Sequence, residues 1–150
     1  MLESYLRSRM PELLDLQVIQ LVEITDGWET EIHAFDVESG KDEERTRDQL
    51  VIRMYAGPWA VHKARKEFAL LKRLHAAGYP VPTVTLIEED SSHLGRPFIL
   101  MQRIEGIAMW NLIESAADAS ELYRLFNTLF FNLHELDWRK LAENPDEFKG

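Results

Sequence analysis

The sequence contains no cysteine, which excludes disulfide bonds, thiolate metal sites and a cysteine nucleophile. It has no apolar run near the length of about 20 residues that a membrane-spanning helix needs. Its first residues include Glu3, Arg7 and Arg9 and form no apolar signal-peptide core. We therefore expect an intracellular, cytoplasmic protein that has no membrane partner.

Basic residues are in the minority. The chain has 17 Lys and Arg against 26 Asp and Glu, which gives a formal net charge of -9. Nucleic acids and anionic membranes are bound through basic patches, so nucleic acid is not expected as a partner. A cationic small substrate is compatible with this charge, although an acidic surface also serves solubility alone.

The chain does contain enough apolar material for one soluble domain with a core, because 45% of its 150 residues are hydrophobic and 29% are charged. Runs or alternations of apolar residues predict strands, and a period near 3.6 residues predicts helices. The predicted strands are Val18–Thr25, Thr30–Val37, Leu50–Tyr55, Thr83–Glu88 and Phe98–Ile104. The predicted helices are Leu2–Met10, Trp59–Ala77, a short segment near Trp110, and Ala119–Trp138.

The order of these elements predicts the fold class. Three strands, a helix and two strands indicate an α+β fold with a five-stranded antiparallel sheet and one packed helix, followed by C-terminal helices. Asp26 and Gly27 form a turn signal between the first two strands. The polar run between Glu38 and Asp48 carries both signs of charge and predicts a solvated hairpin loop.

The last predicted helix carries more apolar side chains than one stripe against a small sheet can bury. They are Leu122, Leu125, Phe126, Leu129, Phe130, Phe131, Leu133 and Leu136. A large contiguous exposed apolar patch is unusual on a soluble monomer. We therefore expect a homodimer in which two copies bury their C-terminal helices against each other.

Two charged residues stand where the pattern calls for apolar side chains. Arg53 interrupts a strand that is otherwise apolar on both faces, and Glu67 falls inside the apolar arc of the helix that follows. A buried carboxylate is costly unless a cation meets it, which favours an ion pair between the two. In the alternative interpretation Glu67 pairs with Lys63 one turn back and Arg53 reaches solvent, and these residues alone favour neither.

With these elements in place, the chain resembles the N-terminal nucleotide-binding lobe of the aminoglycoside phosphotransferase and choline kinase-like family. The resemblance rests on the order and spacing of six segments, which are Ile24–Ile32, Leu50–Arg53, Lys66–Leu74, Gly78–Pro82, Leu94–Met101 and Glu105-Gly106. It implies a protein-kinase-like small lobe with its hinge in residues 1–106. It also implies that residues 107–150 are a helical segment leading into a catalytic lobe that the chain lacks.

The resemblance assigns roles to residues near the phosphates of ATP. It implies that Arg53 is the strand cation on the phosphates and that Glu67 is its helical partner, as in kinase-like folds. Gly27 and Trp28 fall in the loop that covers the phosphates.

The resemblance also assigns an adenine pocket. Met101 falls where the family lines the back of that pocket, and Gln102, Arg103 and Ile104 become the hinge between lobes. The carbonyl of Gln102 and the amide of Ile104 are expected to bind adenine, whose edge offers one donor beside one acceptor. The alternative for this segment is an ordinary edge strand.

The chain departs from the family pattern in two ways. An arginine, Arg53, stands where protein kinases carry lysine, and a guanidinium binds phosphate as a fork rather than as a point charge. The phosphate loop has one glycine, flanked by Glu29 and Glu31, and a carboxylate facing the nucleotide would weaken binding unless both point outward.

Catalytic residues are not expected in this chain. Phosphoryl transfer in kinase-like folds needs an aspartate for the acceptor hydroxyl, plus an asparagine and a second aspartate that hold Mg²⁺. The segment from His134 to Asp137 has the wrong spacing for this loop, and the five histidines show no metal-ligand spacing. The resemblance therefore implies transfer of the ATP γ-phosphoryl group to a small-molecule hydroxyl acceptor, in a chain that is inactive alone.

A rival hypothesis from another class stays open at this point. The chain would then be a non-catalytic module, either kinase-derived or an unrelated α+β domain, whose apolar terminal helix binds a protein partner.

Overall fold

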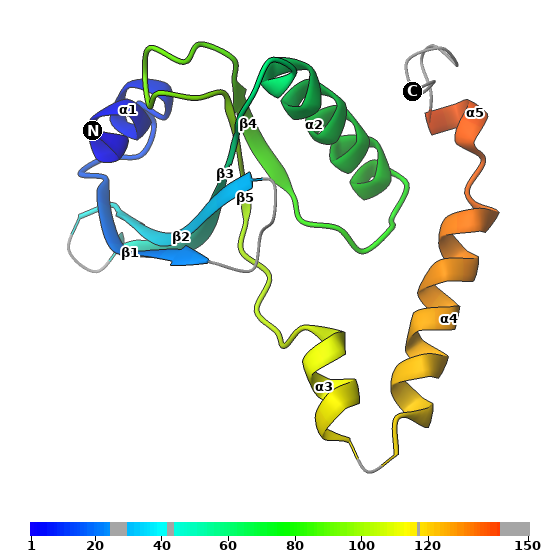
Figure 1. Ribbon diagram of the computed structural model, residues 1–150. Helices are drawn as coiled ribbons and strands as arrows, with labels where there is room; N and C mark the ends of the chain where they lie inside the picture. Colours follow the sequence, from blue (N-terminus) through cyan, green and yellow to red (C-terminus); the bar gives the residue numbers. More distant parts are fainter. Residues whose placement is uncertain (25–29, 42–43, 117, 142–150) are drawn as a thin grey trace. The chain divides into compact units, whose positions relative to one another are not determined.

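The computed structural model describes residues 1–24, 30–41, 44–116 and 118–141 (Figure 1). The chain divides into two compact units. The first consists of Met1–Lys72 and Pro82–Arg103, and the second of Arg73–Val81 and Ile104–Gly150.

The first unit is built on one antiparallel sheet in the strand order β1-β2-β3-β5-β4 (Figure 1). Its strands are β1 (Gln17–Ile24), β2 (Thr30–Ser39), β3 (Thr46–Tyr55), β4 (Val84–Glu88) and β5 (Phe98–Gln102). This confirms the predicted α+β fold with a five-stranded antiparallel sheet. The fifth strand ends at Gln102 rather than at the predicted Ile104. Beyond the strand, the Arg103 amide still donates a hydrogen bond to the Gln49 carbonyl.

The loop predicted between Glu38 and Asp48 is shorter than its polar composition indicates. The β2–β3 ladder continues through Glu38 opposite Arg47 and Ser39 opposite Thr46. Ion pairs from Arg45 to Glu38 and from Arg47 to Asp36 hold this part of the hairpin together. Polar residues therefore extend the hairpin because their side chains pair across it, which the hydrophobic pattern does not register.

Each face of the sheet is covered by a helix. On one face, residues of α1 (Leu2–Arg9) join a buried cluster whose members include Tyr5, Leu6, Phe35, Ile52, Phe98 and Leu100. On the other face, Ala60 and Ala64 of α2 (Ala60–Ala76) join Tyr55, Ile99 and Met101. The period-2 alternation of strands explains the division, since Ile52 and Met54 point to the first cluster and Tyr55 to the second. The predicted packed helix is α2, and α1 adds a second layer.

The second unit contains α3 (Met109–Ser115), α4 (Ser120–Glu135) and α5 (Trp138–Leu141) (Figure 1). The single helix predicted over Ala119–Trp138 is thus two helices. The break follows from Asp137, whose Oδ1 accepts a hydrogen bond from the Arg139 amide at 3.1 Å and so caps a new helix.

Much of the apolar surface of α4 is exposed. Its exposed large apolar side chains are Tyr123, Leu125, Phe126, Phe130, Phe131 and Leu133. The rings of Phe126 and Phe130 stack with centroids 6.1 Å apart.

In the described part of the chain, no helix combines the length and apolar character needed to cross a membrane.

Candidate functional site

The two charges that the sequence pattern singles out lie against each other. Arg53 is on β3 and Glu67 is on α2, and Arg53 Nη1 donates to Glu67 Oε1 at 2.8 Å. The predicted ion pair between strand and helix is confirmed. The alternative, with Arg53 turned to solvent, does not describe this site, because Arg53 binds Glu67 through Nη1 and Thr30 through Nε.

The second oxygen of Glu67 is held by a residue that sequence reasoning missed. Tyr55 follows Arg53 by two positions, so both side chains leave β3 on the same face. The Tyr55 hydroxyl donates to Glu67 Oε2 at 2.7 Å, and the Arg53 guanidinium carbon lies 5.9 Å from the centre of the Tyr55 ring. The period-2 spacing of a tyrosine from the arginine was the available signal.

A third contact fixes the guanidinium from β2. Arg53 Nε donates to Thr30 Oγ1 at 3.1 Å, and Thr30 is the first residue of β2. Within the described residues, Arg53 Nη2 has no partner. The Arg53 side chain keeps 35% of its surface exposed. The arginine is therefore oriented by protein contacts while a part of its fork stays accessible.

Burial sets the protonation of the tyrosine. It raises the pKa of Tyr55 well above the ordinary range, and the hydrogen bond to Glu67 and the charge of that carboxylate raise it further. The hydroxyl therefore remains a donor at any physiological pH.

Glu31 points away from this site, as one of the two carboxylates flanking the predicted phosphate loop should. It alternates with Thr30 on β2, and its oxygens bind His33 Nε2 at 2.8 Å and Arg96 Nη1 at 2.9 Å. The hydrogen bond from His33 is the main cause that lowers the pKa of Glu31, and the charge of Arg96 adds to it. Glu31 therefore has its own partners, His33 and the cation Arg96, on the face opposite Arg53.

Three of the loop residues named by the prediction cannot be placed. Gly27, Trp28 and Glu29 lie outside the described residues. The proposed position of Gly27 and Trp28 over the phosphates stays a prediction.

The predicted adenine-pocket residues lie at the end of β5. Met101 is buried and packs in the cluster that contains Tyr55, so it shares the face of Arg53. The backbone amide of Gln102 donates to the Thr83 carbonyl at 2.8 Å. Ile104 belongs to the second unit. The roles of Met101, Gln102 and Ile104 toward adenine remain predictions.

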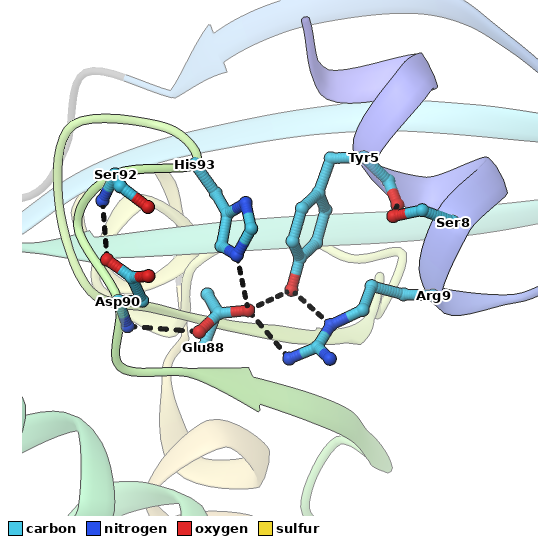
Figure 2. Close-up of polar contacts among 7 residues, drawn as sticks. All are labelled: Tyr5, Ser8, Arg9, Glu88, Asp90, Ser92 and His93. Atoms are coloured by element: carbon cyan, nitrogen blue, oxygen red, sulfur yellow. Dashed lines mark hydrogen bonds and ion pairs between the residues drawn. The ribbon is translucent and has the colours of Figure 1, made fainter.

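A second cluster of a tyrosine, an arginine and a glutamate lies on the opposite face of the sheet (Figure 2). The Tyr5 hydroxyl and Arg9 Nη2, both from α1, donate to Glu88 Oε2 at 2.8 and 2.7 Å. The Asp90 amide donates to Glu88 Oε1 at 3.0 Å, and His93 lies 3.7 Å from Glu88 Oε2. The Glu88 side chain is only 7% exposed. This cluster fastens α1 to the end of β4.

The Glu88 carboxylate is well stabilised as an anion. Burial acts to raise the pKa of Glu88, but the Asp90 amide, the Tyr5 hydroxyl and the charge of Arg9 outweigh it, so this pKa lies below its ordinary value. Burial raises the pKa of Tyr5.

Over the described residues, no group of three or more His, Asp or Glu side chains has an arrangement that could hold a metal ion.

An antiparallel five-stranded sheet with a strand cation paired to a glutamate of the next helix is the arrangement of a kinase-like fold. The comparisons agree with this class. Residues 21–148 match the model of a family described as "Phosphotransferase enzyme family", and the chain belongs to that family. A putative aminoglycoside phosphotransferase from Ralstonia eutropha has a similar structure, with a TM-score of 0.64 and 17% identity. The match covers 94% of this chain and 40% of that one.

Two curated proteins are similar to part of the chain. Acyl-CoA dehydrogenase family member 10 of Mus musculus is 36% identical over an alignment of 94 residues, and the match covers 59% of this chain and 8% of that protein. Acyl-CoA dehydrogenase family member 11 of Gallus gallus is 37% identical over an alignment of 84 residues, and the match covers 54% of this chain and 11% of that protein. The chain thus spans about a tenth of the length of the curated relatives it matches.

Proposed function

We propose that this phosphotransferase-family chain is the ATP-binding lobe of a small-molecule kinase. The observation that carries the proposal is the Arg53 guanidinium, which is held by Glu67 and Thr30 and still has its Nη2 without a partner in the described part of the chain. An oriented, half-exposed arginine with unused donors is suited to bind phosphate oxygens.

In this proposal each residue has a defined task. Arg53 binds the phosphates, and Glu67 fixes the direction of the guanidinium. Met101 lines the pocket for adenine, and the Gln102 carbonyl and Ile104 amide bind its edge. Gly27 and Trp28 cover the phosphates. When bound, Mg-ATP supplies the γ-phosphoryl group that is transferred to a hydroxyl.

The lobe alone supplies only part of the chemistry. We infer that the acceptor aspartate and the Mg²⁺ ligands belong to a further lobe, because the match covers 40% of the similar solved chain. The acceptor is a small molecule with a hydroxyl group, and nucleic acid is not proposed as a partner because of the acidic net charge of -9. We propose a cytoplasmic location, where ATP is available.

The test is a titration of the 150-residue chain with ATP, followed by NMR of the backbone amides. Because we place the Mg²⁺ ligands in a further lobe, we expect weak binding, in the millimolar range, with the largest shifts at β3 and β5 around Arg53 and Met101. A dissociation constant below one micromolar would contradict the proposal that this lobe needs a second one. Shifts confined to other elements would contradict the site.

The alternative function is a protein-interaction module. The observation that favours it is the exposed apolar face of α4, with Phe126, Phe130 and Phe131. This alternative requires no nucleotide, so absence of ATP binding together with partner binding through α4 would support it.

A further inference from the structure

The Arg53–Glu67 pair has an unusual geometry for an arginine and a carboxylate. Such pairs are frequently bidentate, with two parallel N–H···O bonds that use both oxygens. Here one contact joins them, from Nη1 to Oε1 at 2.8 Å. The second oxygen accepts from the Tyr55 hydroxyl instead.

We propose that Tyr55 is a positioning residue that keeps Arg53 Nη2 free for phosphate by occupying the second oxygen of Glu67. The inference rests on the proposed function and deepens it. It explains how an arginine can serve at a position where protein kinases carry lysine. A bidentate pair with the glutamate would use two of the guanidinium donors that phosphate needs.

The partition of donors follows from the contacts. A guanidinium has five N–H donors in a fixed planar arrangement. Thr30 takes the one on Nε and Glu67 takes one on Nη1. If Oε2 of Glu67 had no donor, Nη2 of the same guanidinium could bind it and complete a bidentate pair. With the Tyr55 hydroxyl at 2.7 Å from Oε2, one lone pair of that oxygen is taken, and Nη2 has to compete for the other.

Tyr55 is well suited to hold this position. It is the last residue of β3 and is only 2% exposed, and its backbone amide donates to the Pro97 carbonyl at 2.9 Å. Its ring packs in the cluster with Ala60, Ala64 and Ile99. The hydroxyl is therefore fixed relative to both β3 and α2.

The matched control is the cluster on the other face of the sheet. Tyr5 also donates a buried hydroxyl to a glutamate, Glu88, that binds an arginine, Arg9. There the hydroxyl and the arginine share Glu88 Oε2, and Arg9 Nε additionally donates to the Tyr5 oxygen at 3.1 Å. Tyr5→Phe thus removes a comparable hydrogen bond without touching Arg53.

The experiment compares Tyr55→Phe with Tyr5→Phe in the 150-residue chain, using ATP and inorganic tripolyphosphate as separate probes. NMR of the arginine side-chain nitrogens follows Arg53 directly. We expect Tyr55→Phe to weaken both probes by about tenfold, the effect of losing one hydrogen bond to a charged group. Tyr5→Phe should leave both affinities within about twofold, whatever its effect on melting.

A double variant isolates the mechanism. In Glu67→Gln the amide offers one oxygen, so bidentate capture of Arg53 is no longer available. Adding Tyr55→Phe to this background should change affinity by less than about twofold. Unchanged affinity in Tyr55→Phe alone, or a full tenfold effect that persists in the Glu67→Gln background, overturns the inference. Absence of binding by the unaltered chain overturns the proposed function and this inference with it.

Discussion

The two faces of the sheet carry the same three residue types in two different arrangements. Around Glu88, the carboxylate is almost fully buried and receives Tyr5, Arg9 and the Asp90 amide (Figure 2). The Glu67 side chain is 27% exposed, and its carboxylate accepts hydrogen bonds from Tyr55 and Arg53.

The difference lies in how each arginine uses its donors. Arg9 gives Nε to the Tyr5 oxygen and Nη2 to Glu88, so arginine, tyrosine and glutamate satisfy one another. Arg53 gives Nε and Nη1 to separate partners from β2 and α2, and its Nη2 points to none of the described residues. The first arrangement is suited to holding α1 against the end of β4, and the second is suited to binding a ligand. Each arginine uses two of its five donors in the described residues, so the difference lies in the partners: both bonds of Arg9 go to the Tyr5–Glu88 pair, whereas Arg53 bridges Thr30 and Glu67.

The largest expected effect separates activity from stability at Glu67. In the longer protein that the proposal implies, Glu67→Gln should lower turnover by about a hundredfold, because Arg53 loses the charge that directs it. The free energy of unfolding should fall by less than about 1 kcal/mol, since this carboxylate is partly exposed. Steady-state kinetics and urea unfolding of the same preparation measure both. A parallel loss of turnover and stability would make Glu67 a structural residue.

The converse effect is expected at Glu88. Glu88→Gln leaves Arg9 and the Tyr5 hydroxyl facing a neutral group in a buried site, which should cost about 2 kcal/mol of unfolding free energy. ATP affinity should stay unchanged because the cluster lies on the other face of the sheet. Urea unfolding and the ATP titration check this, and a tenfold loss of ATP affinity would remove the distinction between the two clusters.

The same carboxylate predicts a dependence of stability on pH. The pKa of Glu88 is lower in the folded chain than its ordinary value of about 4.3. Its stabilising contribution is therefore complete above the unfolded pKa and is lost as pH falls through the folded one. We expect the unfolding free energy to fall through this group as the pH drops below the unfolded pKa. Glu88→Gln should lack this part of the slope, and an identical slope in both proteins would contradict it.

The smallest effect concerns association through the second unit. We propose that two copies of the chain associate through the exposed apolar face of α4, where Phe131 is 63% exposed. Sedimentation at micromolar concentration should show a dimer, which Phe131→Glu weakens by about tenfold, while Asn132→Glu beside it serves as control. A monomer at all concentrations would mean that this face has another role.

The sequence predicted the sheet, the helix after β3 and the Arg53–Glu67 pair, because a charge inside an apolar pattern demands a partner. It missed Tyr55 because a tyrosine in an apolar strand looks like core, and only the geometry shows the direction of its hydroxyl. It missed the Glu88 cluster because Tyr5 and Arg9 are 79 or more residues from Glu88 in the chain. Pairings at that separation depend on topology, which local periodicity does not contain.

The role of Arg53 in phosphate binding is tested by replacing one arginine from each cluster. ATP affinity and unfolding free energy are measured together for Arg53→Met and Arg9→Met, which have similar exposure of the original side chains, 35% and 48%. We predict that Arg53→Met weakens ATP binding at least tenfold with little change in stability, and that Arg9→Met does the opposite. Equal ATP affinity in Arg53→Met and the unaltered chain would contradict the claim that Arg53 is the phosphate-binding residue.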